Sequence, residues 1–349
     1  MLHVAMLSKW HVHAAEYAGR LSKMEDVQIT CVWDEEPARG RAWAEELGAD
    51  FEENLDALLA RPDVDAVCID TPTNMHKEVM IKAAKAGKHI YTEKVMCLNV
   101  ADCDEVIRAV EENHVVFTIS LPQRTYPRNL FIKEAIDSGI LGDITVLRCR
   151  NCHDGALAGW LPDYWYDPET TGGGAMMDLS VHTIDLMEYI TGMRVTEVAS
   201  MNEKIAFPEP QYDVEDTSTI LMRMENGAQC VVQSNFNIPD EASKWRVEFF
   251  GTKGRLLGDT MIGQIDGGKL NAVFIDKNVA YSAEQTHADD AGIEIPGDFG
   301  NMYTREIESF SDSILNGKPL VVPASDAVHV QRIMEKAYAS GEELKIMKI

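Results

Sequence analysis

The stretch VDAVCIDTPTNMHKEVMIKAAKAGKHIYTEK (residues 64–94) contains two short apolar runs separated by a helical pattern. The runs are VDAVCID (64–70) and KHIYTE (88–93), and the helical pattern covers roughly residues 76–86. A strand, a helix and a second strand of these lengths predict a βαβ unit with parallel strands.

The same alternation extends along the first third of the chain. Strands are predicted at 3–7, 27–33, 64–70, 88–93 and 115–120, with helices at 11–22, 36–47, 76–86 and 99–112. Right-handed crossovers then give a doubly wound parallel sheet, in which ligands bind beyond the carboxyl ends of the strands. The residues that matter most are therefore those at 8–13, 34–39, 71–76 and 93–97.

The pattern changes after residue 122. A helix (129–139) and a strand (143–151) lead to a region of apolar runs separated by turns, and two further helices are predicted at 301–316 and 325–339. The runs, at 195–205, 217–225, 228–236, 245–251, 254–259 and 269–276, are contiguous, so they predict a large, mostly antiparallel open sheet. We expect an α/β protein with a Rossmann domain (1–122) and a substrate-binding and oligomerisation α/β domain (123–349), because 349 residues exceed one usual core.

Charge and composition narrow the function classes. The net charge of −25 opposes binding to nucleic acid or to an anionic membrane. The chain has no stretch of about 20 apolar residues and does not begin with a signal-peptide pattern. Seven cysteines are scattered along it, and we interpret them as reduced thiols of a cytoplasmic protein.

Three strand ends carry candidate polar residues. Asp34 follows the second strand, where an acid usually binds the adenosine ribose of NAD and repels the 2′-phosphate of NADP; it could instead cap the next helix. Thr71 and Pro72 form a turn after the third strand, and Asn74 is a candidate N-cap for a helix beginning near Met75. Lys94 follows the fourth strand, where it could transfer a proton to or from a substrate hydroxyl or form a solvated pair with Glu93.

A second candidate site lies in GGGAMMDLSVHTIDLMEYITG (172–192). Apolar residues surround the predicted helix on nearly all sides, so the helix is expected to be buried. Asp178, His182 and Asp185 nevertheless recur at i, i+4 and i+7 on one face. This stripe favours general acid–base chemistry over a structural Asp–His pair, since the preceding glycines also permit close approach of a backbone or ligand.

The chain resembles the Gfo/Idh/MocA oxidoreductases, the glucose–fructose oxidoreductase and inositol dehydrogenase family, in the segments 64–94, 163–192 and GTKGRL (251–256). The resemblance covers essentially the whole chain. It implies a Rossmann domain followed by a domain with a large open sheet, a nicotinamide cofactor, and a sugar, inositol or similar polyol as substrate.

The resemblance also implies roles for individual residues. Lys94, Asp178 and His182 match the catalytic residues, and these three together with Trp165 are expected to bind substrate. Expected cofactor contacts are Ser8, Trp10, His11, His13, Asp34, Arg39, Thr71, Pro72, Asn74, His76, Glu93, Lys94 and Arg124. We expect NAD rather than NADP because of Asp34, no metal ion, and a homo-oligomer formed through the carboxyl-terminal sheet.

The chain departs from the family pattern in two places. The G-x-G-x-x-G loop expected at 8–13 reads Ser8-Lys9-Trp10-His11-Val12-His13, with no glycine at the three positions that allow close approach of a pyrophosphate. The helix N-terminus still offers N–H groups to a phosphate. Val95 replaces the proline that follows the motif lysine. His11 and His13 could hold a divalent metal with a carboxylate, but the favoured interpretation is that they simply begin a helix.

The primary hypothesis is reversible hydride transfer between nicotinamide and a hydroxyl carbon, with His182 or Lys94 taking the hydroxyl proton. One alternative is a lyase or glycosidase that uses tightly bound NAD for a transient oxidation. Another is a non-catalytic sugar sensor. The substrate pocket is expected to be lined by strand ends and by the long loops 152–171, 235–242 and 283–300.

Overall fold

The computed structural model describes residues 1–206, 212–239, 242, 245–260, 268–274, 293–295 and 302–349. The chain forms two compact units. The first comprises Met1–Thr125, Asp167–Gly172 and Asn301–Arg332, and the second comprises Tyr126–Tyr166, Gly173–Gly300 and Ile333–Ile349. Two segments distant in sequence thus join the amino-terminal residues in the first unit.

The first unit contains a six-stranded parallel sheet of order β3-β2-β1-β4-β5-β6. Its strands are β1 (Leu2–Leu7), β2 (Val27–Trp33), β3 (Asp50–Phe51), β4 (Ala66–Ile69), β5 (His89–Thr92) and β6 (Phe117–Ile119). The strand order reverses between β1 and β4, and the crevice at such a switch point is where doubly wound sheets bind ligands. The predicted fold class is confirmed for this part of the chain.

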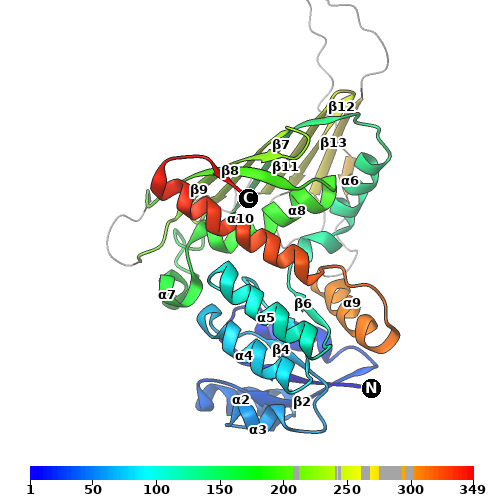
Figure 1. Ribbon diagram of the computed structural model, residues 1–349, viewed down its shortest axis with the longest axis vertical. Coiled ribbons are helices and arrows are strands. Elements are labelled where there is room, and N and C mark those ends of the chain that lie inside the picture. Colours follow the sequence, from blue (N-terminus) through cyan, green and yellow to red (C-terminus); the bar gives the residue numbers. More distant parts are fainter. Residues whose placement is uncertain (207–211, 240–241, 243–244, 261–267, 275–292, 296–301) are drawn as a thin grey trace, which may run out of the picture. The chain divides into compact units, whose positions relative to one another are not determined.

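Helices cover this sheet. They are α1 (Ala14–Leu21), α2 (Pro37–Leu47), α3 (Leu55–Leu59), α4 (Thr73–Lys85), α5 (Val100–Glu112), α7 (Pro168–Thr171) and α9 (Met302–Asn316), with the 3₁₀ turn η1 (Pro122–Thr125). Helix α4 packs on α5, and α1 packs on α9. Figure 1 shows α4 and α5 running side by side in the cyan part of the chain.

Two predicted helix starts are wrong. Helix α4 begins at Thr73 with Pro72 as its N-cap, whereas Asn74 lies exposed within the first turn. The fixed φ of Pro72 suits the start of a helix, so no polar cap is needed there. Helix α1 begins at Ala14, three residues later than predicted, so His11 lies in a turn and His13 is the N-cap.

The second unit contains a nine-stranded sheet of order β14-β13-β12-β11-β7-β10-β9-β8-β15 among the described residues. Its strands are β7 (Ile144–Cys152), β8 (Val195–Glu203), β9 (Thr217–Met224), β10 (Gln229–Asn235), β11 (Trp245–Gly251), β12 (Gly254–Thr260), β13 (Gly268–Phe274), β14 (Ile293–Ile295) and β15 (Met347–Lys348). All neighbouring pairs are antiparallel except β7 with β10. The prediction of a large, mostly antiparallel sheet is therefore confirmed.

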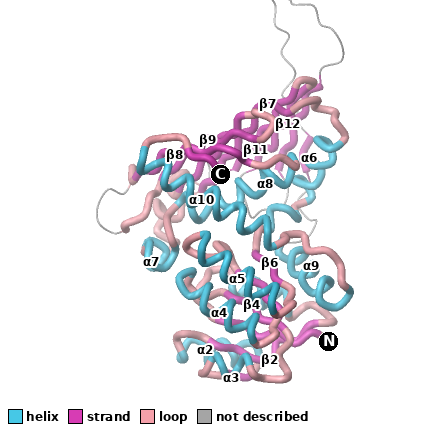
Figure 2. The backbone as a smooth tube through the Cα atoms, in the orientation of Figure 1, coloured by secondary structure: helices cyan, strands magenta, loops and turns pink. Residues whose placement is uncertain are grey.

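One face of this sheet is covered by helices. Helix α6 (Pro127–Asp137) packs on α8 (Val181–Thr191), which packs on β7, and the π-helical turn η3 (Met176–Ser180) packs on β7 and β10. Figure 2 shows α6 and α8 in cyan beside the magenta strands. The remaining elements are the 3₁₀ turn η2 (Asp163–Tyr166) and α10 (Ala324–Glu343), whose residues from Ile333 onward belong to this unit.

None of the helices within the described ranges is long and apolar enough to cross a membrane.

Candidate functional site

The loop after β1 keeps one feature of a glycine-rich phosphate loop. Ser8 has a φ of 78°, the left-handed conformation that glycine adopts without steric cost, and it is fully buried. Its amide donates to the Trp33 carbonyl at 2.7 Å, and its hydroxyl accepts from the Trp10 amide at 3.1 Å. The tight turn of the first glycine position is thus retained with a serine in place.

Most amides of this loop donate hydrogen bonds within the protein. The amide of Lys9 donates to Asp34 Oδ2, that of His11 to the Asp70 carbonyl, and that of His13 to His11 Nδ1. The expectation that the first helical amides stay available is wrong at Ala14, whose N–H donates to the His11 carbonyl at 3.1 Å. Phosphate binding here would require these hydrogen bonds to be exchanged.

Asp34 lies at the end of β2 and is almost fully buried. Its carboxylate accepts from the amides of Lys9 and Glu36 and from Arg39 Nε at 2.9 Å and Arg39 Nη2 at 2.7 Å. Four donors fill the acceptor positions of one carboxylate. The N-cap of α2 is Glu36, without a side-chain cap hydrogen bond, so Asp34 does not cap that helix; it anchors Arg39 and the loop after β1.

Glu93 follows β5 and lies in the centre of a buried polar cluster. Its Oε2 is 3.1 Å from His13 Nδ1 and 3.5 Å from His11 Nδ1, and it accepts a hydrogen bond from the Tyr17 hydroxyl. Burial opposes ionisation of this carboxyl, but the facing His11 and His13 hold its pKa well below the usual value. Sequence reasoning placed these residues at two strand ends without foreseeing that they touch.

Lys94 is buried beside Glu93 at the carboxyl end of β5, with 7% of its surface exposed. Its amide donates to Glu93 Oε1 at 2.9 Å, and its peptide bond to Val95 is cis. The His76 ring bridges this turn to the previous one, with Nδ1 2.9 Å from the Val95 carbonyl and Nε2 3.0 Å from the Thr71 carbonyl. His76 therefore fixes the turn that follows Lys94.

A second buried carboxylate contacts β5 and the residues that follow β6. Glu306 of α9 accepts hydrogen bonds from the Tyr91 hydroxyl, the Ser120 hydroxyl and the Leu121 amide. Burial raises its pKa from 4.5 to about 8, against the effect of those donors. Its position more than 180 residues from its partners left no local signal in the sequence.

Arg124 was expected near the cofactor. In the structure it is buried, and its Nη1 lies 3.0 Å from Asp326 Oδ2 and 3.1 Å from the Val321 carbonyl. These contacts hold η1 to the turn before α10 and to the first turn of that helix.

In the second unit, Asp178 lies in the π-helical turn that precedes α8. Asp178 and His182 are both half-buried, whereas Asp185 is fully buried. The predicted stripe therefore divides into two accessible groups and one core group. The π turn widens the helix at Asp178, and such turns occur frequently at functional sites.

The glycines before this turn allow a close approach of backbone. A Cβ on Gly174 would lie 2.0 Å from the Glu215 carbonyl oxygen, and the Ala175 amide donates to that oxygen at 2.9 Å. The Glu215 carboxylate accepts from the amides of Gly174 and Met176 and from the Tyr338 hydroxyl. Glu215, which sequence reasoning missed, thus anchors the first amides of the segment that carries Asp178.

His153 is a further residue that sequence reasoning missed. It directly follows β7, stacks on Phe236, and has its Nε2 3.8 Å from Asp178 Oδ2. The Gly155 amide donates to its Nδ1 at 3.0 Å, which leaves the proton on Nε2, facing Asp178. Trp165, the expected substrate contact, is buried in η2. The expected lining segments 240–241, 283–292 and 296–300 lie outside the described residues.

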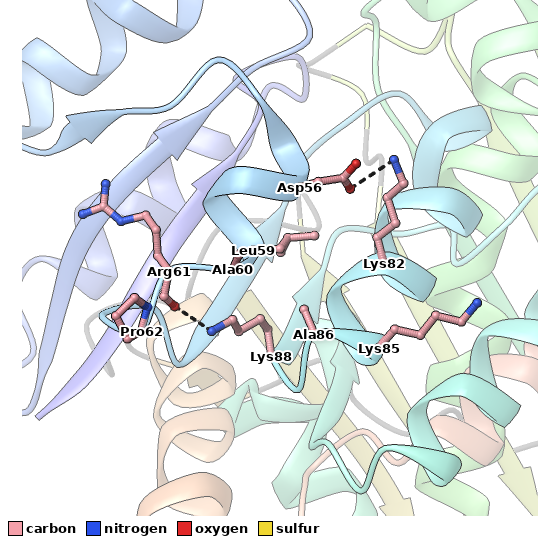
Figure 3. Close-up of a pocket in the computed structure, with 9 residues that line it drawn as sticks. All are labelled: Asp56, Leu59, Ala60, Arg61, Pro62, Lys82, Lys85, Ala86 and Lys88. Carbon is pink, nitrogen blue, oxygen red and sulfur yellow. Dashed lines mark hydrogen bonds and ion pairs between the residues drawn. The ribbon is translucent and has the colours of Figure 1, made fainter.

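A hollow of about 510 Å³ lies elsewhere in the first unit (Figure 3). Its lining comes from α3, the end of α4 and the turns that precede β4 and β5, so it is at the amino-terminal side of the sheet. Lys82 pairs there with Asp56, and Lys88 donates to the Arg61 carbonyl. Because parallel sheets bind ligands at the opposite edge, this hollow is separate from the candidate site.

Comparisons with known proteins agree with this arrangement. The family model described as an oxidoreductase family with an NAD-binding Rossmann fold matches residues 10–121, and the Gfo/Idh/MocA C-terminal domain matches residues 130–257. Myo-inositol 2-dehydrogenase of Thermotoga maritima is 27% identical over 337 residues, covering 95% of this chain and 94% of that protein. A 2,7-anhydro-N-acetylneuraminate hydratase of Mediterraneibacter gnavus is 29% identical over 69% of this chain and 63% of its own length.

Among solved structures, GenD2 from gentamicin A biosynthesis, in complex with NAD, superposes with a TM-score of 0.84. The match covers 100% of this chain and 96% of that one, at 22% identity, and shows a shared fold. Both halves of the chain thus match one group of proteins, and the chain belongs to the Gfo/Idh/MocA family of oxidoreductases, whose amino-terminal domain is an NAD-binding Rossmann fold.

Proposed function

We propose that the protein is an NAD-dependent dehydrogenase that transfers a hydride between nicotinamide and a hydroxyl carbon of a sugar, an inositol or a related polyol. The observation that carries this proposal is the buried Lys94 at the carboxyl edge of a parallel sheet, in a turn fixed by His76. Relatives named as inositol dehydrogenases support the substrate class.

Two features of the first unit support a dinucleotide at the adenosine side. Asp34 stands where a carboxylate binds the ribose hydroxyls, and Ser8 supplies the left-handed turn. On ribose binding, the ribose hydroxyls would replace Arg39 as hydrogen-bond donors to Asp34. The buried Asp34 carboxylate disfavours a 2′-phosphate on that ribose. When bound, the nicotinamide would supply the hydride acceptor.

Proton transfer falls to the chain's own side chains. In this proposal His182 or Lys94 accepts the hydroxyl proton, and the Lys94 ammonium stabilises the developing carbonyl oxygen. Asp178 would orient His182, which lies four residues later, and its contact with His153 would in turn hold the Asp178 carboxylate in one position.

To test this, purified protein is incubated with NAD and each of a panel of inositols and sugars, and the absorbance of reduced nicotinamide is measured. We expect turnover with at least one compound and a loss of about 100-fold or more in Lys94→Ala, the usual contribution of a positioned acid–base group. Lys85→Ala is the matched control, since Lys85 is exposed near the other edge of the same sheet. Equal rates in wild type and Lys94→Ala would refute the assigned role.

A second candidate is a lyase, hydratase or glycosidase that keeps NAD bound and oxidises its substrate transiently. A hydratase among the relatives favours it. This candidate predicts NAD retained through purification and substrate consumed without net reduction of the cofactor.

We also propose that the second sheet forms the contact between subunits. The register places Leu221 of β9 beside Val231 of β10, with Met201 of β8 on the same face. Leu221 and Met201 are 56% and 71% exposed, and such adjacent apolar residues are typical of an interaction surface.

A further inference from the structure

The loop that lacks glycines brings two imidazoles to a buried carboxylate. His11, His13 and Glu93 each offer one ligand atom, and these atoms lie within 4.8 Å of one another. We infer that these three residues form a binding site for one divalent transition-metal ion such as Zn²⁺. This inference concerns the first unit alone and does not depend on the proposed dehydrogenase activity.

Two of the three distances between ligand atoms suit a metal of this size, and the third is within 4.8 Å. Ligand bonds of about 2.0–2.2 Å place neighbouring ligand atoms about 3.0–3.5 Å apart around a tetrahedral or octahedral ion. The Oε2 of Glu93 is 3.1 Å from His13 Nδ1 and 3.5 Å from His11 Nδ1. A metal could therefore enter with small side-chain shifts.

The chemistry of the donors points to the same class of ion. Two imidazoles and one carboxylate are a ligand set for zinc and other first-row transition metals, and three protein ligands leave positions open for water or another ligand. His11 Nδ1 accepts a hydrogen bond from the His13 amide and lies 3.5 Å from Glu93 Oε2, another acceptor atom. Two acceptor atoms so placed are stabilised by a cation between or beside them.

Neighbouring groups hold the ligands in place. The Tyr17 hydroxyl donates to Glu93 Oε2, and Glu93 Oε1 accepts from the Lys94 amide. The Tyr303 hydroxyl is 3.4 Å from both ring nitrogens of His13. Partners of this kind orient metal ligands, and they fix the Glu93 carboxylate before any ion arrives.

The site also explains what replaced the glycines. His13 stands at the third glycine position, and His11 lies between the second and third. A loop built only to cover the sheet would not need two imidazoles directed at the same carboxylate oxygen. The alternative is a hydrogen-bonded cluster that binds no metal, and the experiment below separates the two.

The experiment uses the full-length chain, stripped with a chelator and titrated with Zn²⁺ and Co²⁺. Calorimetry should give one Zn²⁺ per chain, the melting temperature should rise with Zn²⁺, and Co²⁺ should develop a visible absorption band. His11→Gln and His13→Gln should each weaken Zn²⁺ binding by at least about 10-fold. Glu93→Gln, which keeps an acceptor for the Lys94 amide, should do the same.

The control is His3→Gln. His3 forms a pair with Asp65 in the same unit, with Nδ1 and Oδ2 3.0 Å apart, and it lies near the amino-terminal end of β1, whereas the cluster lies beyond the carboxyl end. Its substitution should leave Zn²⁺ affinity unchanged. The inference is overturned if wild type shows no saturable binding and no Zn²⁺-dependent rise in melting temperature, or if His3→Gln weakens binding as much as the ligand variants. Should a ligand variant fail to fold, the wild-type titrations decide alone.

Discussion

Replacing Glu306 by glutamine should remove a large part of the pH dependence of stability. Glu306 is 1% exposed and accepts hydrogen bonds from Tyr91, Ser120 and the Leu121 amide. Burial is the largest influence on this carboxyl and raises its pKa to about 8, and the nearby Glu93 adds to the effect. The folded protein therefore keeps Glu306 protonated at neutral pH.

The sign and size of the effect follow from linkage. The folded-state pKa lies above the unfolded value, so the stabilising contribution is fully present below pH 4.5 and is lost as the pH rises through about 8. Within that window the free energy of unfolding falls by about 1.4 kcal/mol for each pH unit, or about 5 kcal/mol in all. Glutamine cannot ionise, and its amide oxygen still accepts hydrogen bonds.

Urea denaturation of wild type and Glu306→Gln at about pH 6 and about pH 8 measures the difference. From the lower to the higher of these two pH values, the free energy of unfolding should fall by about 2–3 kcal/mol more in wild type than in the variant. Glu308→Gln, an exposed position on the same helix, should behave like wild type. If Glu306→Gln loses stability as steeply as wild type, Glu306 is ionised in the folded protein and the reasoning is wrong.

Three further predictions concern the two candidate sites and the proposed subunit contact. Gly174→Ala should lower the free energy of unfolding by at least about 2 kcal/mol, because its Cβ would meet the Glu215 carbonyl. Gly19→Ala should leave the free energy of unfolding unchanged, because the space around Gly19 is open. Thermal denaturation measures the stability of both variants. Arg39→Gln should lower the free energy of unfolding by about 2–3 kcal/mol in urea denaturation, because it leaves the buried Asp34 carboxylate without its guanidinium. Arg41→Gln should lower it by less than about 1 kcal/mol, because its partner Glu53 is exposed. Equal losses of stability in the two variants would contradict this reasoning. Leu221→Glu should reduce the mass seen by light scattering while Leu344→Glu, on another exposed leucine, leaves it unchanged; an unchanged mass in both would exclude the sheet face as the subunit contact.

Periodicity predicted the long elements well because each carries its own signal. The run at 27–33 coincides with β2, and 245–251 coincides with β11. Strand β3 has two residues and α3 has five, too few for a periodic pattern, and both were missed. The predicted helix start was wrong where backbone geometry sets the first helical residue, as at Pro72.

The candidate sites were predictable in part. Asp178, His182 and Lys94 stood out because polar groups on apolar elements or at strand ends require an explanation. His153 and Glu215 could not be found, since their contacts with the π-helical segment join residues far apart in sequence. The pairing of His11 and His13 with Glu93 spans about 80 residues and depends on the order of the strands in the sheet.

The most direct test of the proposed activity follows a labelled hydrogen. Inositols and sugars deuterated at their hydroxyl-bearing carbons are incubated with the protein and NAD, and the cofactor is examined by mass spectrometry. We expect deuterium from at least one compound to appear in the nicotinamide, and we expect Lys94→Ala, but not Lys85→Ala, to abolish this transfer. A cofactor that stays unlabelled with every compound, under conditions where NAD is bound, would contradict hydride transfer by this protein.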